Sequence, residues 1–239
     1  MRALLLLLTL FTTSSFAGTI HLAVSSNFAQ AAQELANQYA SLSSDEIIIS
    51  SASSGKLFIQ IQQGAPFDIF LSADKDKPKR LYQEGIGVQP PAIYAIGRLV
   101  LWSREIDLSR GAENPLNMTQ IKRLAIANPT TAPYGKAAKE VIDRLTFPPV
   151  TWTLIQGDNI AQTYQFASTG NVDAAFIAES QAIRETQGYF WNVPHSFHSP
   201  IEQGALLLST ANDNPAAQNF YNYLFSSEAK ATLKQFGYE

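Results

Sequence analysis

Four short polar turns carry the residue types that could bind a charged ligand in this chain. Each turn follows a β-branched or apolar run and precedes a segment with helical periodicity. The turns are Val24-Ser25-Ser26-Asn27, Ala52-Ser53-Ser54-Gly55, Pro133-Tyr134-Gly135 and Gly157-Asp158-Asn159-Ile160. A helix that begins at such a turn presents unpaired backbone N–H groups and a partial positive charge. Several helix starts around one cleft would therefore bind an anion without any lysine or arginine.

The same turns also have an ordinary structural explanation. Ser, Asn and Asp are the residue types that cap helix N-termini, so a single turn of this kind indicates a cap and nothing more. Four such turns favour an anion site, but their spacing leaves open whether they face one another. For Asp158 we expect a capping role, although its carboxylate could also accept a hydrogen bond from a protonated ligand.

The segments between the turns alternate between strand and helix patterns, which favours an α/β fold with largely parallel sheets. Strands are expected at residues 19–24, 47–51, 67–72, 99–102, 124–127, 152–155, 174–177 and 205–209. Helices are expected at about 25–39, 55–63, 133–145, 159–167 and 215–236. Ligands of open α/β sheets lie beyond the carboxyl ends of the strands, and all four turns would lie there.

Helical spacing also predicts which side chains are buried, because residues three or four positions apart share one face of a helix. The predicted core residues are Phe28, Ala32, Leu35, Tyr39, Leu57, Ile61, Ala138, Val141, Ile142, Leu145, Phe220, Leu224 and Leu233. Gly64 is placed to end the second helix, and Phe147-Pro148-Pro149 is placed to end the third.

Composition excludes several classes of protein. The 239 residues include no cysteine, which rules out disulfides, thiolate metal sites and a cysteine nucleophile. The formal net charge is −3, and no cluster of Lys and Arg is interleaved with aromatic residues, so we expect no nucleic-acid partner. The length suits one large domain or two lobes of roughly 100 residues each.

The N-terminus has the pattern of an export signal. Met1-Arg2 supplies a positive charge, and the apolar run that follows is too short to span a bilayer as a mature helix. Ser15-Phe16-Ala17 places small residues at positions −3 and −1 relative to a cut after Ala17. We therefore expect residues 1–17 to be a signal peptide rather than a retained anchor.

Catalysis is a weaker interpretation of this sequence. His195-Ser196-Phe197-His198 has a spacing that could bind a metal, but it follows Pro194 in an expected loop and lacks a nearby third ligand. Ser54 does not lie in a Gly-x-Ser-x-Gly elbow. We therefore expect a binding protein rather than a hydrolase, with no cofactor and no directly ligated metal ion.

A longer motif resembles that of a known family. The run Gln62-Gln63-Gly64-Ala65-Pro66-Phe67-Asp68-Ile69-Phe70-Leu71-Ser72-Ala73-Asp74 resembles the Q-x-G-A-P-x-D-x-F-x-S-A-D signature of periplasmic molybdate-binding proteins, the substrate-binding subunits of ABC importers. Segments 23–25, 52–57, 123–135 and 157–160 are similar to the four ligand loops of that family. The resemblance covers nearly the whole mature chain, in the same order.

This resemblance implies a type II-like periplasmic binding fold with two α/β lobes, each a mainly parallel sheet flanked by helices. Two crossover strands, near Ala95–Leu99 and near Pro200–Gly204, would form a hinge. Residues 18–97 and 201–239 would then make the first lobe, and residues 98–200 the second. The resemblance also implies a periplasmic protein that passes its ligand to the permease of an ABC importer, and we expect it to be a monomer.

The resemblance further implies which residues bind the ligand, molybdate or tungstate. Ser25 and Ser54 would donate hydrogen bonds from their hydroxyl and backbone N–H groups. Tyr134 and Ile160 would donate from backbone N–H groups only. Each is a neutral donor, and hydrogen bonds to a charged acceptor are the stronger ones.

One position departs from the family pattern. Many members have a tyrosine donor where this chain has Ala178, so we keep Ala178 and Ser26 as possible additional site residues. Whether Asp158 or Glu179 contacts the ligand stays open. The missing donor leaves sulfate, phosphate or an organic anion as the alternative ligand, although a carboxylate binder usually needs an arginine clamp and no turn contains an arginine.

Overall fold

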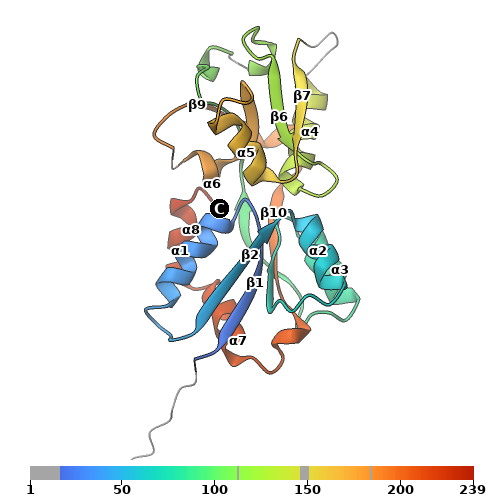
Figure 1. Ribbon diagram of the computed structural model, residues 1–239, viewed down its shortest axis with the longest axis vertical. Helices are drawn as coiled ribbons and strands as arrows, with labels where there is room; N and C mark the ends of the chain where they lie inside the picture. Colours follow the sequence, from blue (N-terminus) through green and yellow to red (C-terminus); the bar gives the residue numbers. More distant parts are fainter. Residues whose placement is uncertain (1–16, 112, 146–150, 184) are drawn as a thin grey trace, which may run out of the picture.

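The computed structural model describes residues 17–111, 113–145, 151–183 and 185–239 and shows two α/β lobes stacked along the long axis of the molecule (Figure 1). Most of the expected signal peptide, and the Phe147-Pro148-Pro149 segment, lie outside the described residues. Within the described residues, no helix combines the length and the apolar character needed to cross a bilayer.

The first lobe is built on a mixed sheet with the strand order β2-β1-β3-β10-β4. These strands are β2 (Glu46–Ala52), β1 (Thr19–Ser25), β3 (Ile69–Leu71), β10 (Ile201–Leu207) and β4 (Ala92–Gly97). Strand β1 pairs in parallel with β2 and β3, whereas β10 runs antiparallel to both β3 and β4. The sheet is therefore mainly parallel, with β10 reversed.

The second lobe repeats this plan with the strand order β7-β6-β8-β5-β9. These strands are β7 (Thr153–Gly157), β6 (Arg123–Ala127), β8 (Ala174–Ala178), β5 (Leu99–Ser103) and β9 (Tyr189–Asn192). Here β5 is the reversed strand, antiparallel to β8 and β9. The chain thus enters the second sheet between β4 and β5 and returns to the first at β10.

Helices cover both faces of each sheet. On the first sheet, one face packs against α1 (Ala29–Tyr39), α7 (Pro215–Tyr223) and α8 (Ser227–Gln235), and the other packs against α2 (Ser54–Gln62) and α3 (Asp76–Gln83). Because both faces are covered, strand β3 and residues 22–24 of strand β1 are apolar and buried.

The second sheet is covered in the same way. Helix α4 (Pro133–Leu145) packs on one face and α5 (Ile160–Ser168) on the other, and the short α6 (Glu179–Ala182) follows β8 directly. Short 3₁₀ turns occupy Leu108–Gly111, Pro115–Asn117, His195–Phe197 and Ser209–Ala211. The predicted core residues are buried, except that Leu145 is only partly buried.

Several predicted elements differ from the structure. The single helix expected at 215–236 is two helices, because Ser226 adopts an extended conformation and its Oγ accepts a hydrogen bond from Ala229 N (3.1 Å), which caps α8. The first helix begins at Ala29 rather than near Ser25, since residues 25–28 form a turn closed by Phe28 N donating to Ser25 O (2.8 Å). Strand β10 begins at Ile201 rather than at 205.

Other elements were absent from the prediction. Helices α3 and α6 and strand β9 were not predicted, and strand β4 was anticipated only as a crossover near Ala95–Leu99. Strand β4, for example, is defined by its pairing with β10, which is distant in sequence. Such pairings leave little signal in a short window of sequence.

The start of α4 lies directly against the carboxyl end of β6. Pro133 occupies the first helical position, where its missing N–H costs nothing. Gly135 follows two residues later, and a Cβ atom at this position would collide with the backbone carbonyl of Ala127. Glycine therefore allows this helix start to reach the end of the strand.

We expect Gly135→Ala to lower the free energy of unfolding of the unliganded protein by about 1 to 3 kcal/mol, because a rigid backbone carbonyl cannot move away from the added methyl group. Urea unfolding measures this change. Lys136→Ala, an exposed substitution in the same helical turn, is the control and should change stability by less than about 0.5 kcal/mol. Equal stability of the two variants would contradict the packing argument.

Candidate functional site

One small cavity between the lobes brings the four polar turns together. It is lined by Ser25, Ser26, Asn27, Ser53, Ser54, Ala73, Ala132, Pro133, Tyr134 and Ile160. The predicted site residues Ser25, Ser54, Tyr134 and Ile160 therefore meet in one place, although they lie as far as 135 positions apart in the sequence. The cavity has a volume of about 10 Å³, which is room for roughly one water molecule.

The second turn places the Ser54 hydroxyl at the cavity as a hydrogen-bond donor. Ser53 is the N-cap of α2, and its Oγ accepts from Lys56 N (3.4 Å). Ser54 is the first helical residue, fully buried, and its Oγ accepts a hydrogen bond from Ala73 N (3.0 Å). Because that bond uses a lone pair, the hydroxyl hydrogen of Ser54 remains free to donate.

The first turn contributes a second buried hydroxyl. Ser25 is 2% exposed, and its Oγ has no hydrogen-bond partner among the described residues. The neighbouring Ser26 N donates to Ala52 O (3.0 Å), which fixes the first turn to the second. A buried polar atom without a partner is uncommon in a folded protein and suits a ligand contact.

The second lobe contributes two helix starts. Tyr134 is the second residue of α4 and Ile160 the first residue of α5, so the backbone N–H groups of both lack an intrahelical partner. Asn159 caps α5, with Oδ1 accepting from Gln162 N (3.0 Å). The Tyr134 ring points away to the hinge, where its buried hydroxyl lies against Gly97, and burial raises the pKa of that hydroxyl well above the ordinary value.

Two expectations about neighbouring residues change. The cap of α5 is Asn159, so the expected capping role of Asp158 is wrong. The Asp158 carboxylate instead pairs with Lys56 Nζ of the other lobe at 2.9 Å, and both side chains are largely exposed. Ala178 is buried but does not line the cavity, and its N–H donates to Gln181 Oε1 (3.1 Å).

The cavity also contains residues that sequence reasoning missed. Asn27 and Ala73 are among them, and Asn27 is 4% exposed. Asn27 belongs to a turn that the sequence singled out, but a run of consecutive polar residues does not reveal which of them faces inward. Glu179 does not line the cavity, and burial raises the pKa of its carboxyl while the nearby Arg98 opposes that shift.

The electrostatics of the cavity come from the backbone. Among the described residues, those that line it include no lysine, arginine, aspartate or glutamate. The starts of α2, α4 and α5 supply partial positive charge and free N–H groups instead. Such a site favours a small, fully ionised anion, which needs donors and offers none.

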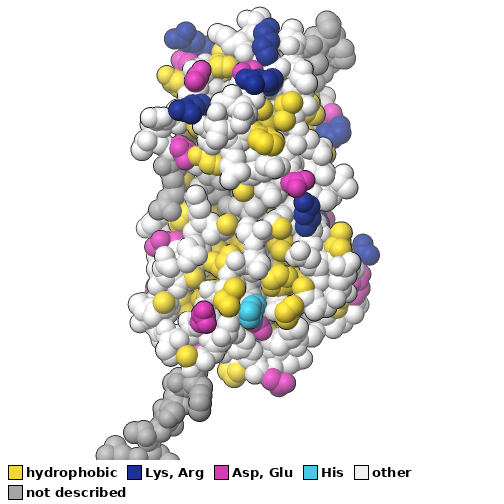
Figure 2. Space-filling model, in the orientation of Figure 1, with side chains coloured by type: hydrophobic (Ala, Val, Ile, Leu, Met, Phe, Trp, Pro, Cys, Tyr) yellow, Lys and Arg dark blue, Asp and Glu magenta, His cyan; other side chains and the backbone are white. Residues whose placement is uncertain are grey.

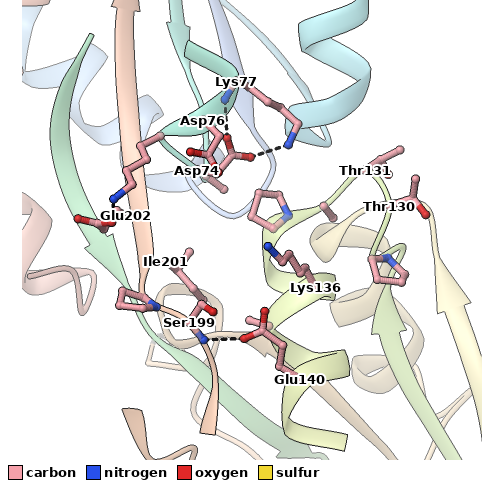
Figure 3. A pocket seen from close by; sticks show the side chains of 17 residues that line it. Asp74, Asp76, Lys77, Thr130, Thr131, Lys136, Glu140, Ser199, Ile201 and Glu202 are labelled. Carbon is pink, nitrogen blue, oxygen red and sulfur yellow. Dashed lines mark hydrogen bonds and ion pairs between the residues drawn. The ribbon is translucent and has the colours of Figure 1, made fainter. Parts of the chain in front are cut away.

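A larger groove adjoins this cavity but suits an anion less well. It measures about 350 Å³ and shares Ala73, Ala132 and Pro133 with the cavity. Its charged groups largely satisfy one another: the Lys77 ammonium contacts Asp74, the Lys75 ammonium contacts Glu202, and Glu140 accepts from Ser199 N (Figure 3). These carboxylates, together with Asp76, outnumber the lysines Lys75, Lys77 and Lys136 and would repel an anion.

Contacts across the cavity hold the two lobes together. Gly55 N donates to Thr131 O (2.8 Å), and a Cβ atom at Gly55 would lie 2.9 Å from that oxygen. On another side, Ser180 Oγ donates to the backbone oxygen of Asn27 (3.1 Å). The structure therefore shows a closed arrangement of the lobes.

Within the described residues, no cluster of three or more histidine, cysteine, aspartate or glutamate side chains could hold a metal ion. The His195-Ser196-Phe197-His198 segment forms an exposed 3₁₀ turn followed by a half-buried His198, and His195 Nε2 contacts the Arg98 guanidinium.

Comparisons with known proteins show which proteins this chain is similar to. The molybdate-binding protein ModA of Azotobacter vinelandii is 39% identical over 227 residues, which cover 93% of this chain and 90% of that protein. The molybdate-binding protein ModA of Rhodobacter capsulatus is 37% identical over 227 residues, covering 93% and 88%. The solved structure of an Azotobacter vinelandii periplasmic molybdate-binding protein matches with a TM-score of 0.84 and 30% identity, covering 92% of this chain and 98% of that one.

A family model described as bacterial extracellular solute-binding protein matches residues 20–239, which is almost the entire described chain. Together with these relatives, the match shows that the chain belongs to the family of bacterial extracellular solute-binding proteins.

Proposed function

We propose that this protein captures molybdate or tungstate in the periplasm and delivers it to the permease of an ABC importer. The observation that carries the proposal is the uncharged cavity at which four polar turns converge. The similarity to two molybdate-binding proteins along most of their length supports the choice of ligand.

In this proposal the oxyanion lies between the hydroxyl groups of the first lobe and the helix starts of the second. Ser25 and Ser54 donate from one side, and the backbone N–H groups of Tyr134 and Ile160 donate from the other. Ser26 is a further candidate because it lines the cavity. Each hydrogen bond to the charged ligand contributes about 1.5 to 3 kcal/mol net, so four to six of them support micromolar to nanomolar affinity after association costs.

The absence of side-chain carboxylates among the lining residues favours a fully ionised ligand. Hydrogen phosphate carries a proton that needs an acceptor, and Asp158, the acidic residue of the fourth turn, is paired with Lys56 instead. Molybdate, tungstate and sulfate bring no such proton. Phosphate should therefore bind more weakly than these anions.

Sulfate is the second candidate because the cavity is small. The cavity volume is about 10 Å³, and sulfate, which is also fully ionised, is smaller than molybdate.

The proposal includes transport rather than catalysis. The residues that line the cavity contain serine hydroxyls but no histidine, lysine or carboxylate that could act as a base.

We further propose that residues 1–17 are a signal peptide and that the mature protein is a monomer that meets the permease transiently. On the face drawn in Figure 2, Lys and Arg side chains are interspersed with Asp and Glu rather than gathered in one patch.

A thermal-shift screen of the mature protein against molybdate, tungstate, sulfate, phosphate and chromate tests the ligand. A ligand at 100 times its dissociation constant adds about 2.7 kcal/mol of stability. We expect large shifts with molybdate and tungstate and little or none with phosphate. A shift with sulfate alone would identify sulfate, rather than molybdate or tungstate, as the ligand. No shift with any anion would overturn the proposal.

Ser54→Ala should weaken molybdate binding by about 1 to 3 kcal/mol, because one ligand oxygen loses its donor. Calorimetry with molybdate measures the change. Ser53→Ala is the matched control: it removes the cap of α2 and lowers the free energy of unfolding by about 1 kcal/mol, but it should affect affinity less. An unchanged affinity in Ser54→Ala would remove this hydroxyl from the site.

Gly55→Ala should weaken molybdate binding without lowering the stability of the unliganded protein. Alanine favours helix by up to about 1 kcal/mol, so the unliganded protein should be as stable as the wild type or more so. The added methyl group would press on Thr131 whenever the lobes close, and molybdate affinity should fall about 5- to 150-fold. Gln60→Ala, on the exposed side of the same helix, should leave affinity unchanged. Wild-type affinity in Gly55→Ala would show that closure does not require this contact.

A further inference from the structure

The backbone and side chain of Asn27 are held by residues outside the cavity. Its backbone oxygen accepts a hydrogen bond from Ser180 Oγ (3.1 Å) and lies 3.0 Å from the Tyr238 hydroxyl oxygen. Its side-chain Nδ2 donates to Gln203 Oε1 (2.8 Å) and to the Tyr238 hydroxyl (3.2 Å). Both amide hydrogens of this cavity residue are therefore used within the protein.

These groups form a closed ring in which every hydrogen has one acceptor. The Asn27 amide donates to the Tyr238 oxygen, the Tyr238 hydroxyl donates to Ser180 Oγ (3.0 Å), and Ser180 Oγ donates back to Asn27 O. Asn27, Ser180 and Tyr238 are each at most 4% exposed. Burial raises the pKa of Tyr238 to about 12, so its hydroxyl keeps its proton at neutral pH.

Two members of the ring are fixed to the first lobe. Asn27 follows β1, and Tyr238 follows α8. Next to Tyr238, Glu239 exchanges two backbone hydrogen bonds with Ile96 of β4, at 2.7 and 3.1 Å. Tyr238 and Asn27 therefore keep their relative positions when the lobes separate.

Ser180 belongs to the second lobe. It lies in α6, which directly follows β8, and Figure 1 shows α6 at the boundary with the first lobe, near α8 and α1. Both hydrogen bonds of Ser180 therefore cross from the second lobe to the first. An interaction made only while the lobes are together favours the closed state, which is the condition for shifting the equilibrium between closed and open forms.

We propose that Ser180 and Tyr238 are positioning residues that, through their hydrogen bonds to Asn27, stabilise the closed lobes and so set the affinity for the anion without touching it. This inference rests on the proposed function, because it concerns the affinity of the same cavity. The apparent dissociation constant rises in proportion as the closed, binding-competent fraction falls.

Molybdate calorimetry on Ser180→Ala, Tyr238→Phe and the double variant tests the coupling. Each single variant should weaken binding about 3- to 30-fold, since one or two buried hydrogen bonds of the closed state are lost. The double variant should lose less than the product of the two, because both changes break one ring. Additive losses, or wild-type affinity in Ser180→Ala, would overturn the proposal.

Two controls separate positioning from general stability. Tyr221→Phe removes a buried hydroxyl that donates to Ala205 O (3.4 Å) within the first lobe, and it should leave affinity unchanged. Ser180→Ala should melt close to the wild-type temperature without ligand, because a ring formed only in a minor closed fraction adds little to the stability of the unliganded protein. If Ser180→Ala lowers the free energy of unfolding of the unliganded protein by as much as it lowers the binding free energy, Ser180 has only a structural role and the proposal is overturned.

A distance between spin labels measures closure directly. The chain contains no cysteine, so Ile59→Cys on α2 and Leu154→Cys on β7 provide unique labels at exposed positions of the two lobes. Ser180→Ala should lower the closed fraction of the unliganded protein and raise the molybdate concentration that closes it. If no oxyanion closes the labelled wild type but Ser180→Ala still lowers the closed fraction, the proposed ligand is wrong and the proposed role of the ring is supported. If Ser180→Ala gives the wild-type distances both with and without molybdate, the proposal for the ring is overturned.

Discussion

The convergence of helix starts on an uncharged cavity is the constraint on which the rest of the structure depends. Within a helix, free N–H groups occur only in the first turn, so the donors of α2, α4 and α5 each require a strand that ends at the cavity and a helix that begins there. The two sheets meet this requirement because their parallel strands direct their carboxyl ends toward the space between the lobes. Gly135 and Gly55 follow from the same constraint, since both allow backbone to approach backbone closely.

Neutral donors also explain why closure is coupled to binding in the proposed mechanism. Neither lobe alone surrounds the ligand, because the serine hydroxyls belong to one lobe and the starts of α4 and α5 belong to the other. Direct contacts between the lobes, such as Gly55 with Thr131 and Ser180 with Asn27, add to the ligand's own bonds. Affinity in such a design depends on residues that bind the anion and on residues that bind only the other lobe.

Local patterns in the sequence predicted the alternation of strands and helices, the buried stripes of α1, α2 and α7, and the four turns. These succeeded because burial on one face of a helix or strand leaves a period in the sequence. The same local patterns predicted one helix in place of α7 and α8, because the apolar period continues across Ser226. The helical backbone is interrupted there, since Ser226 is extended. The local patterns also assigned the cap of α5 to Asp158, although Asn159 is the residue whose side chain accepts the capping bond.

The sequence by itself determined the α/β class, the resemblance to molybdate-binding proteins and the turns that supply the candidate donors. Only the tertiary structure decided that these turns meet, that Asn27 lines the cavity and Ala178 does not, and that Asp158 pairs with Lys56. The ring of Asn27, Ser180 and Tyr238 likewise joins residues that lie up to 211 positions apart. The spacing of apolar residues within one helix or strand reflects only which face of that element is buried. Contacts between distant residues depend on how the two sheets, and the two chain segments that connect them, bring those residues together.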